Sequence, residues 1–219
     1  MNTAGRESER PVGVSDQDGL RTECRLVAAE DVPALSTMLR DNGVAFLGMP
    51  HAGMHRAVLR DAVQGEDVSC VVAVRGGQVV GWTVAIVYSR RYWTRFLARH
   101  PILGFIYVGS RLATALFARK SAVPEVHGPT WPRVMNREWG GAHPTVARHL
   151  DITVLEAYRR GGVATALQSA QIADLKRRGV RWLDAYINTS NLPSILLHIK
   201  NGWSLVSAER DALLISLEI

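Results

Sequence analysis

The sequence of 219 residues predicts one domain of the α/β (α+β) class. Three observations support this prediction. Runs rich in β-branched residues are interspersed with stretches whose apolar residues recur at helical spacing, so strands and helices are both expected. Arg75-Gly76-Gly77 separates two such β-rich runs, which is a typical hairpin signal. In the second half, a glycine-rich turn joins a strand-like segment at 149–155 to an amphipathic helix.

The first half of the chain is expected to hold a tail, three strands and two helices. Residues 1–20 are rich in Gly, Ser, Pro and charge, which predicts a flexible tail in front of a domain at 21–219. The acidic residues of this tail do not fit a secretory signal. The expected elements are a strand at 23–28, helices at about 30–39 and 54–63, and hairpin strands at 68–74 and 78–87.

An insertion at about 89–145 follows the hairpin. Its part at 89–120 is basic and apolar, and the apolar run at 102–118 is short for a membrane span and contains Arg111. A helical hairpin packed on the domain is the simplest interpretation. An amphipathic helix at a membrane surface, or a wall for a long acyl or acceptor chain, are the alternatives. The segment 124–144 is expected to be a long loop.

Positive charge is concentrated in one part of the chain. The net charge is +6 and the pI is near 9.8. No Asp or Glu occurs between Asp67 and Glu125, whereas this interval is rich in basic residues: Arg75, Arg90, Arg91, Arg95, Arg99, Arg111, Arg119 and Lys120. Such a surface attracts nucleic acid, acidic lipid headgroups or an acidic substrate. The alternative is that these charges contribute only to solubility. Nucleic acid is not expected, because no recognised nucleic-acid motif accompanies the arginines.

The second half is expected to alternate strands and helices. The expected elements are strand 149–155, helix 163–178 ended by Gly179, strand 182–187, helix 192–200 and strands 203–207 and 212–218. Cys24 and Cys70 lie in apolar runs, which favours two buried thiols in a reduced compartment over a reactive thiol. The His and Cys residues show no ligand-type spacing, so no metal is expected.

The most informative segment is the glycine-rich turn at 158–167. It presents backbone N–H groups at the positive end of a helix dipole, an arrangement that binds pyrophosphate or another polyanion. Its spacing differs from those of the two best-known phosphate-binding loops, GxxxxGK[ST] and GxGxxG. It reads Arg159-x-x-Gly162-x-Ala164.

A second motif follows downstream. It consists of Asn191, a small residue three positions on, His198 seven positions on, and Gly202-Trp203. Together the two motifs resemble the acyl-CoA loop and the later segment of the GNAT superfamily of N-acyltransferases, over about 150–206. The resemblance implies a mixed central sheet of six to seven strands flanked by helices, with a helical insertion between strands 3 and 4. His in place of the more common Tyr resembles the phosphinothricin-type acetyltransferases.

The resemblance also implies a binding site for acetyl-CoA. Strand 149–155 would separate from its neighbour, and the main chains of Val154 and Leu155 would pair with the pantetheine amides. Asn191 would bind the CoA arm or cap the helix that follows it. The pyrophosphate would be held by the turn, whose residues are Arg159, Arg160, Gly161, Gly162, Val163, Ala164 and Thr165; for the two arginines, a solvated charge at the helix start is the alternative.

The same resemblance suggests catalytic residues. His198 would protonate the departing CoA thiolate, with a satisfied core histidine as the alternative. His149 and Asp151 alternate along their strand and are expected to share one face, where either of them can act as the base for the amine. Asp151 is the preferred candidate. The sequence does not rank the further options Glu138, His143 and Glu156.

We therefore expect a cytoplasmic N-acetyltransferase that uses acetyl-CoA as co-substrate and acts on a small-molecule or peptide amine by direct attack. An acidic or phosphorylated acceptor fits the basic interval better than a polycation. One alternative is a non-catalytic acyl-CoA-binding or regulatory module. The other is a membrane-surface acyltransferase that uses a longer acyl chain and contacts lipid through 89–120. Homodimer formation stays open.

Overall fold

The computed structural model describes residues 12–15, 21–41, 52–65, 67–87, 89–102, 146–208 and 211–219. Its strands are β1 Val12–Ser15, β2 Arg21–Leu26, β3 Val68–Arg75, β4 Gln78–Val87, β5 Val146–Val154, β6 Trp182–Asn188, β7 Ser204–Ala208 and β8 Ala212–Glu218. Its helices are α1 Asp31–Asp41, α2 Ala52–Gln64, α3 Ser89–Arg99, the short 3-10 helix η2 Glu156–Tyr158, α6 Val163–Arg177 and α7 Leu192–Lys200. The elements predicted for the two halves are all present, with ends shifted by a few residues.

The strands form one mixed sheet, as predicted. Their order is β1-β2-β3-β4-β5-β6-β8-β7, and β5 and β6 are a parallel pair in an otherwise antiparallel arrangement. The eighth strand, β1, lies within the segment that composition predicts to be a tail. It pairs with β2 through the backbone, from Val12 opposite Cys24 to Ser15 opposite Arg21, and such pairing needs no apolar pattern. The prediction of a tail is thus wrong for residues 12–15.

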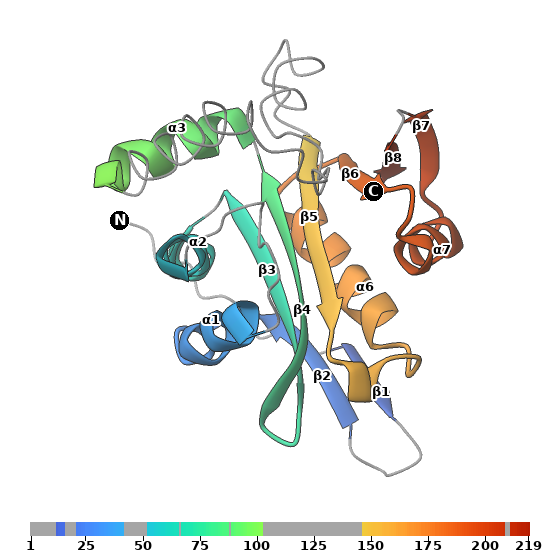
Figure 1. The fold of residues 1–219 in the computed structure, drawn as a ribbon, viewed down its shortest axis with the longest axis horizontal. Helices are drawn as coiled ribbons and strands as arrows, with labels where there is room; N and C mark the ends of the chain where they lie inside the picture. Colours follow the sequence, from blue (N-terminus) through green and yellow to red (C-terminus); the bar gives the residue numbers. More distant parts are fainter. Residues whose placement is uncertain are drawn as a thin grey trace, which may run out of the picture.

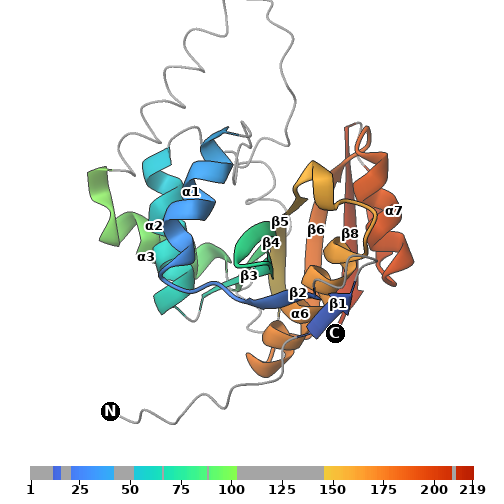
Figure 2. The same ribbon diagram turned by 90° about the horizontal axis from the view of Figure 1, so that it is seen from below.

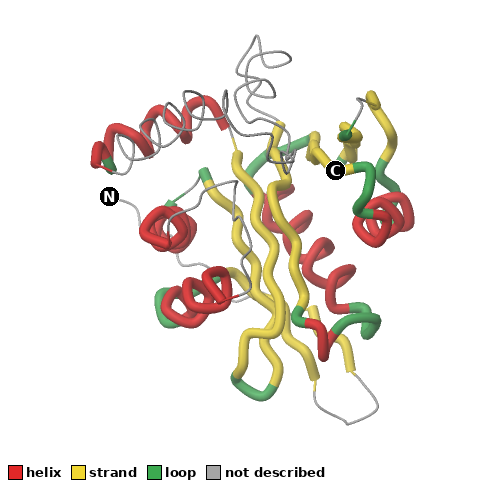
Figure 3. The backbone as a smooth tube through the Cα atoms, in the orientation of Figure 1, coloured by secondary structure: helices red, strands yellow, loops and turns green. Residues whose placement is uncertain are grey.

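Helices cover both faces of the sheet. α1, α2 and α3 lie on one face, and α6 and α7 lie on the other (Figure 1, Figure 2). The first face holds a core in which Leu35, Val58 and Phe96 pack against Trp82 and other strand residues. The opposite face buries two further clusters, beneath α6 and around Trp203. The fold is therefore three layers, with the strands in the middle (Figure 3).

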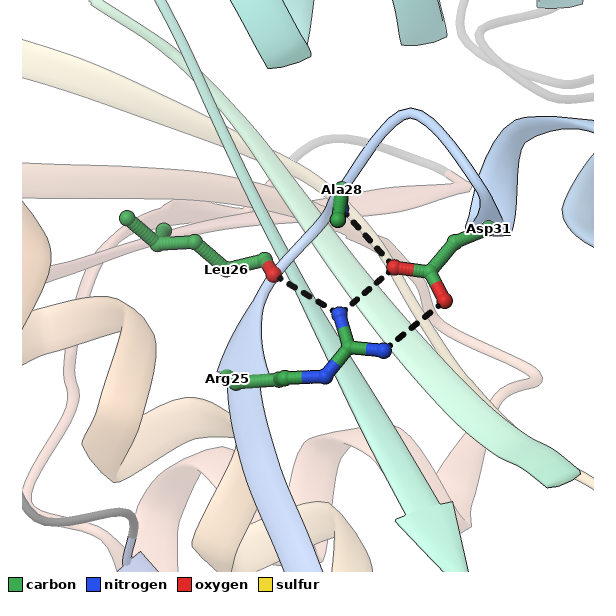
Figure 4. Close-up of polar contacts among 4 residues, drawn as sticks. All are labelled: Arg25, Leu26, Ala28 and Asp31. Carbon is green, nitrogen blue, oxygen red and sulfur yellow. Dashed lines mark hydrogen bonds and ion pairs between the residues drawn. The ribbon is translucent and has the colours of Figure 1, made fainter. Parts of the chain in front are cut away.

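The entry into α1 is fixed by a buried carboxylate. Asp31 accepts hydrogen bonds from the Arg25 guanidinium, at 2.6 and 3.0 Å, and from the Ala28 N–H at 2.8 Å (Figure 4). Arg25 also donates to the carbonyl oxygen of Leu26 at 3.2 Å. An acid in the first turn of a helix is stabilised by the free N–H groups there. The contacts fix the direction in which the chain leaves β2.

The hairpin predicted from Gly76-Gly77 is confirmed. Both glycines have positive φ, 55° and 78°, as the tight turn between two paired strands requires. A side chain at either position would be strained by the backbone conformation. The hairpin pairs β4 with β3, and the other edge of β4 pairs with β5, which forms one side of the candidate site.

α3 begins the insertion as a helix. Tyr92 and Phe96 are fully buried in the core of the first face, and Arg95 and Arg99 are ion-paired with Asp67 and Asp61 at 3.1 and 2.9 Å. The apolar side of α3 thus faces the protein. The rest of the predicted insertion, including the loop at 124–144, lies outside the described residues. Within those that are described, no helix is long and apolar enough to cross a membrane.

β5 and β6 run together only at their beginnings. Their register extends from Val146 opposite Trp182 to His149 opposite Ala185, yet β5 continues to Val154 and β6 to Asn188. Beyond His149 the two strands no longer pair. The separation predicted for this strand from the resemblance is therefore seen, and it begins at His149.

Candidate functional site

A cleft occupies the place where β5 and β6 separate. Its volume is about 130 Å³. One wall comes from β5, a second from β6, and α7 closes the end, with the lining residues His149, Leu150, Asp151, Ile152, Ala185, Tyr186, Ile187, Asn188, Asn191, Ser194 and His198. All three predicted catalytic residues and Asn191 are among them. The structure thus brings together residues that are separated by up to 49 positions in the sequence.

A bulge in β5 separates His149 from Asp151. Opposite β4, His149 pairs with Ala85 and Asp151 pairs with Val84, so Leu150 is the extra residue. Val84 belongs to the core under α1 and α2, whereas Ala85 belongs to the core around α6 and Trp203. Simple alternation predicts that His149 and Asp151 share a face, and this prediction is wrong. The inserted residue turns the two side chains to opposite faces of the sheet.

His149 is buried on the α6 side. Its Nδ1 lies 2.8 Å from Oε1 of Gln171, and its ring centroid lies 5.3 Å from that of His198 in an edge-to-face arrangement. Burial lowers the pKa of His149 to about 3, with a further contribution from the nearby His198 and an opposing one from the Gln171 hydrogen bond. The imidazole is therefore neutral at physiological pH.

His198 is also buried, on α7. Its Nδ1 lies 2.7 Å from the carbonyl oxygen of Ser194, one helical turn earlier. A carbonyl oxygen only accepts, so Nδ1 carries the hydrogen and Nε2 the lone pair. Burial lowers the pKa of His198, and the bond to Ser194 opposes this. The Trp203 ring, at a centroid distance of 4.7 Å, packs against the imidazole. His198 in this state accepts a proton before it can give one.

Asp151 lies on the opposite face, against the core under α1 and α2. Its Oδ2 accepts a hydrogen bond from Trp82 Nε1 at 2.7 Å, and its Oδ1 accepts one from Thr153 Oγ1 at 3.2 Å. Burial raises the pKa of Asp151, and the hydrogen bonds from Trp82, from Thr153 and from the Ile152 backbone oppose that rise. Its acceptor atoms are thus already engaged by neighbouring residues.

The predicted anion-binding turn has the geometry expected of one. Gly162 is the N-cap of α6 with φ 78°, and Arg160 before it also has positive φ, 67°. The turn requires a left-handed conformation at position 162, which glycine adopts readily and a residue with a Cβ adopts only at a cost in free energy. The N–H of Ala166 is bonded back to the Gly162 carbonyl oxygen at 3.0 Å. The N–H groups that precede Ala166, including those of Val163, Ala164 and Thr165, have no hydrogen-bond partner inside the helix because of the helix geometry.

One of the two backbone groups expected to bind the pantetheine arm is used within the sheet. The Leu155 N–H donates to the Val80 carbonyl oxygen at 2.9 Å, so it faces β4 and not the cleft. Main-chain groups alternate sides along a strand, so those of Val154 point away from β4. The Val154 carbonyl oxygen accepts from Arg159 Nε at 3.0 Å. Arg159 thus folds back on the strand that precedes its turn, which neither of the two interpretations of this arginine describes.

Asn191 caps α7, as one of its two predicted roles requires. Its side chain accepts from the Ser194 N–H at 3.3 Å, and a proline follows in the first turn. Glu156 is exposed in η2 and does not line the cleft. Glu138 and His143 lie outside the described residues. Both cysteines are buried, as predicted, and burial raises the pKa of Cys24 to about 11.

Sequence reasoning missed Gln171, which lies completely buried in α6 and contacts His149. It also missed Thr83, whose Oγ1 lies 3.1 Å from the same Gln171 oxygen. A usable signal was present for the first of these. Leu167, Gln171 and Leu175 follow one another at four-residue spacing, so a polar residue interrupts an apolar stripe.

Comparison with known proteins supports the fold. A scan against protein-family models finds no match, and neither does a comparison with curated protein sequences. Solved structures do match. The GNAT domain of S. lividans PAT superposes with a TM-score of 0.58 and 15% identity, over 95% of this chain and 97% of that one.

Two other structures are similar to a comparable degree. The ribosomal-protein-alanine N-acetyltransferase from Brucella melitensis gives a TM-score of 0.55 and 18% identity, over 90% of this chain and 99% of that one. The PaiA N-acetyltransferase from Thermoplasma acidophilum in complex with coenzyme A gives a TM-score of 0.54 and 11% identity, over 90% of this chain and 99% of that one. The chain has the GNAT fold. This conclusion rests on the strand order, on the separation of β5 from β6 and on these superpositions.

Proposed function

We propose that this protein transfers an acetyl group from acetyl-CoA to an amine of a small molecule or a peptide. The observation that carries the proposal is the cleft between β5 and β6, because two buried, neutral imidazoles line it and the N-terminus of α6 follows β5 closely along the chain. The structural neighbours agree with this proposal, since they are acetyltransferases and one of them is in complex with coenzyme A.

The donor would be held mainly by backbone groups. The N–H groups of the turn 160–165 and the dipole of α6 suit a pyrophosphate, and Gly162 keeps the backbone accessible. The edge of β5 beyond His149, which does not pair with β6, suits the amides of the pantetheine arm, with the main chain of Val154 rather than that of Leu155 directed away from β4. Asn191, at the mouth of the cleft, would contact the same arm.

The chemistry needs one proton to move. The amine loses a proton as it attacks the acetyl carbon, and the CoA sulfur gains one as the carbon–sulfur bond breaks. A histidine with a lone pair on Nε2 can serve both needs in turn, first as acceptor and then as donor. His198 would give the proton to sulfur, and His149 or Asp151 would remove it from the amine. The structure favours His149, because the Asp151 oxygens already accept hydrogen bonds.

The acceptor is predicted from charge alone. The basic interval favours an acidic or phosphorylated amine over a polycation. Arg95 and Arg99 contribute less to this than the sequence suggests, because each is paired with an aspartate. A panel of acceptors at two salt concentrations is the test. A rate that is highest for an acidic amine and falls with salt is expected, and a best kcat/KM with a polyamine would contradict it.

Thermal unfolding with and without acetyl-CoA, longer acyl-CoAs and free CoA tests donor binding. A ligand that binds only the folded state at a hundredfold excess over Kd adds about 2.7 kcal/mol to the free energy of unfolding. Gly162→Val is expected to abolish the shift. Gly179→Val is the matched control, because Gly179 has φ 77° at the other end of α6 and shares the backbone strain but not the turn.

Release of free CoA thiol with amines then separates an enzyme from a binding module. Turnover with any amine supports the proposal. A stabilising shift without turnover across the acceptor panel would favour the non-catalytic module, and the absence of a shift with every thioester would remove the acyl-CoA site altogether.

A further inference from the structure

Gln171 is a buried amide on the apolar side of α6. None of its surface is exposed, and it lies between Leu167 and Leu175 on one line of the helix. A leucine or methionine would fill the same space without the cost of burying an amide. The packing of α6 on the sheet therefore does not explain this residue.

Hydrogen bonds fix the orientation of the Gln171 amide. Its Nε2 donates to the carbonyl oxygen of Ser69 at 3.5 Å, so the atom directed at His149 is the acceptor Oε1. His149 Nδ1, at 2.8 Å from this oxygen, must then carry the hydrogen. The lone pair of His149 is on Nε2, and the described residues offer that atom no hydrogen-bond partner.

The two imidazoles of the cleft are thus held in the same way. His149 donates from Nδ1 to an amide oxygen, and His198 donates from Nδ1 to the Ser194 carbonyl oxygen, so each has its lone pair on Nε2. Neither partner titrates. Ala85 of β4 and Ala185 of β6 flank His149 in the sheet. Of the groups that face His149 from α6 and α7, the titratable one is His198.

We infer that Gln171 is a positioning residue that holds His149 as a proton acceptor beside His198. The inference rests on the proposed acetyl transfer and adds to it the route of one proton. Nε2 of His149 takes the surplus proton from the amine nitrogen once that nitrogen has bonded to the acetyl carbon. The CoA sulfur, which has received the electron pair of the broken carbon–sulfur bond, takes up a proton from solvent by way of Nε2 of His198, and His149 releases its proton to solvent. Both imidazoles are neutral before and after turnover.

Substitutions at position 171 test the inference. Gln171→Met keeps the length of the side chain and removes the acceptor; kcat is expected to fall roughly tenfold, with KM for acetyl-CoA unchanged. Gln171→Glu keeps an acceptor oxygen and adds a negative charge, which favours the protonated imidazole. The acidic limb of the pH profile of kcat/KM is therefore expected to move to higher pH in Gln171→Glu.

Gln168→Met is the matched control. Gln168 is buried on the same helix, 1% exposed, but it accepts a hydrogen bond from Asn201 and has no contact with His149 among the hydrogen bonds of the described residues. Gln168→Met is expected to lower the free energy of unfolding and to leave the pH profile of kcat/KM unchanged. Equal effects of Gln168→Met and Gln171→Met on kcat and on stability, with the pH profile of Gln171→Glu unchanged, would overturn the inference.

Imidazole nitrogen chemical shifts give a readout that needs no turnover. In the wild type, the His149 signals should be those of a neutral ring protonated at Nδ1, and Gln171→Met should convert them to a mixture of tautomers. A tautomer that is the same in the wild type and in Gln171→Met overturns the positioning role. If no amine is acetylated, the proposed function fails, and the chemical shifts still decide the role of Gln171.

Discussion

The polar side chains on the two faces of β5 differ in how their hydrogen-bonding atoms are used. On the α6 face, His149 is held through one ring nitrogen by Gln171, and the other nitrogen has no partner among the described residues. On the opposite face, Asp151 accepts hydrogen bonds from Trp82, from Thr153 and from a backbone N–H. Both side chains are one residue away from the bulge at Leu150. His149 is buried and Asp151 is half-buried, and the two also differ in their remaining hydrogen-bonding capacity.

This difference bears on which group can act as a base. Protonation of Asp151 competes with the hydrogen bonds that its oxygens accept, whereas Nε2 of His149 has no such competing bond among the described residues. If the protein is the proposed acetyltransferase, we therefore expect proton transfer on the α6 face and a structural role for Asp151 on the other face. Four experiments can break or sharpen this assignment.

The largest effect is expected on the α6 face, from His198→Phe. The substitution keeps an aromatic ring against Trp203 and removes both nitrogens, so kcat should fall by roughly 10²–10⁴-fold while KM for acetyl-CoA changes little. Steady-state kinetics with a fixed amine measure this. Ile199→Ala, at an exposed neighbouring position, serves as the control. A variant within threefold of the wild type would remove His198 from the chemistry.

The pH dependence of stability should report His149. Its pKa is lowered to about 3 by burial, against 6.5 in the unfolded chain, so the unfolded state binds more protons between these values. The stabilising contribution is complete above pH 6.5 and is lost as the pH falls toward 3, with a slope of up to about 1.4 kcal/mol per pH unit. Urea unfolding at several pH values measures the slope. His149→Gln should reduce it, and an unchanged slope would contradict the burial of a neutral ring.

A smaller effect is expected on the other face, from Trp82→Phe. The loss of the indole N–H removes the donor to Asp151 and should lower the free energy of unfolding by about 1–3 kcal/mol. Trp203→Phe is the control, because the Trp203 Nε1 has no partner in the described part of the chain. Denaturant midpoints compare the two variants. A larger loss from Trp203→Phe would show that packing and not the hydrogen bond decides the cost.

The smallest effect on rate is expected from Asp151→Asn. Asparagine keeps an oxygen for the Trp82 N–H, so kcat should change by less than about tenfold, whereas removal of a general base usually costs 10²–10⁴-fold. The same assay as for His198→Phe provides the number. A loss of a hundredfold or more would reverse the comparison and make Asp151 the base.

Much of this fold could be predicted from local sequence signals. The Gly76-Gly77 turn and the Asn191 cap are each determined by a few neighbouring residues, and both are confirmed. The faces of His149 and Asp151 could not be predicted in this way, because the bulge depends on the register between β5 and a strand far away in the sequence. Gln171 was recognisable only as a polar interruption of a stripe, and its partner is defined by packing.

The short parallel ladder between β5 and β6 also affects the mechanics of the sheet. Four register pairs, from Val146–Trp182 to His149–Ala185, are the strand pairing that joins β1 through β5 to β6, β8 and β7. The sheet thus consists of two half-sheets with a seam, and separation along this seam requires the loss of fewer backbone bonds than separation of β4 from β3 or β5, or of β6 from β8. A molecule bound in the gap beyond His149 would contact both edges of the seam and act as a brace between the halves.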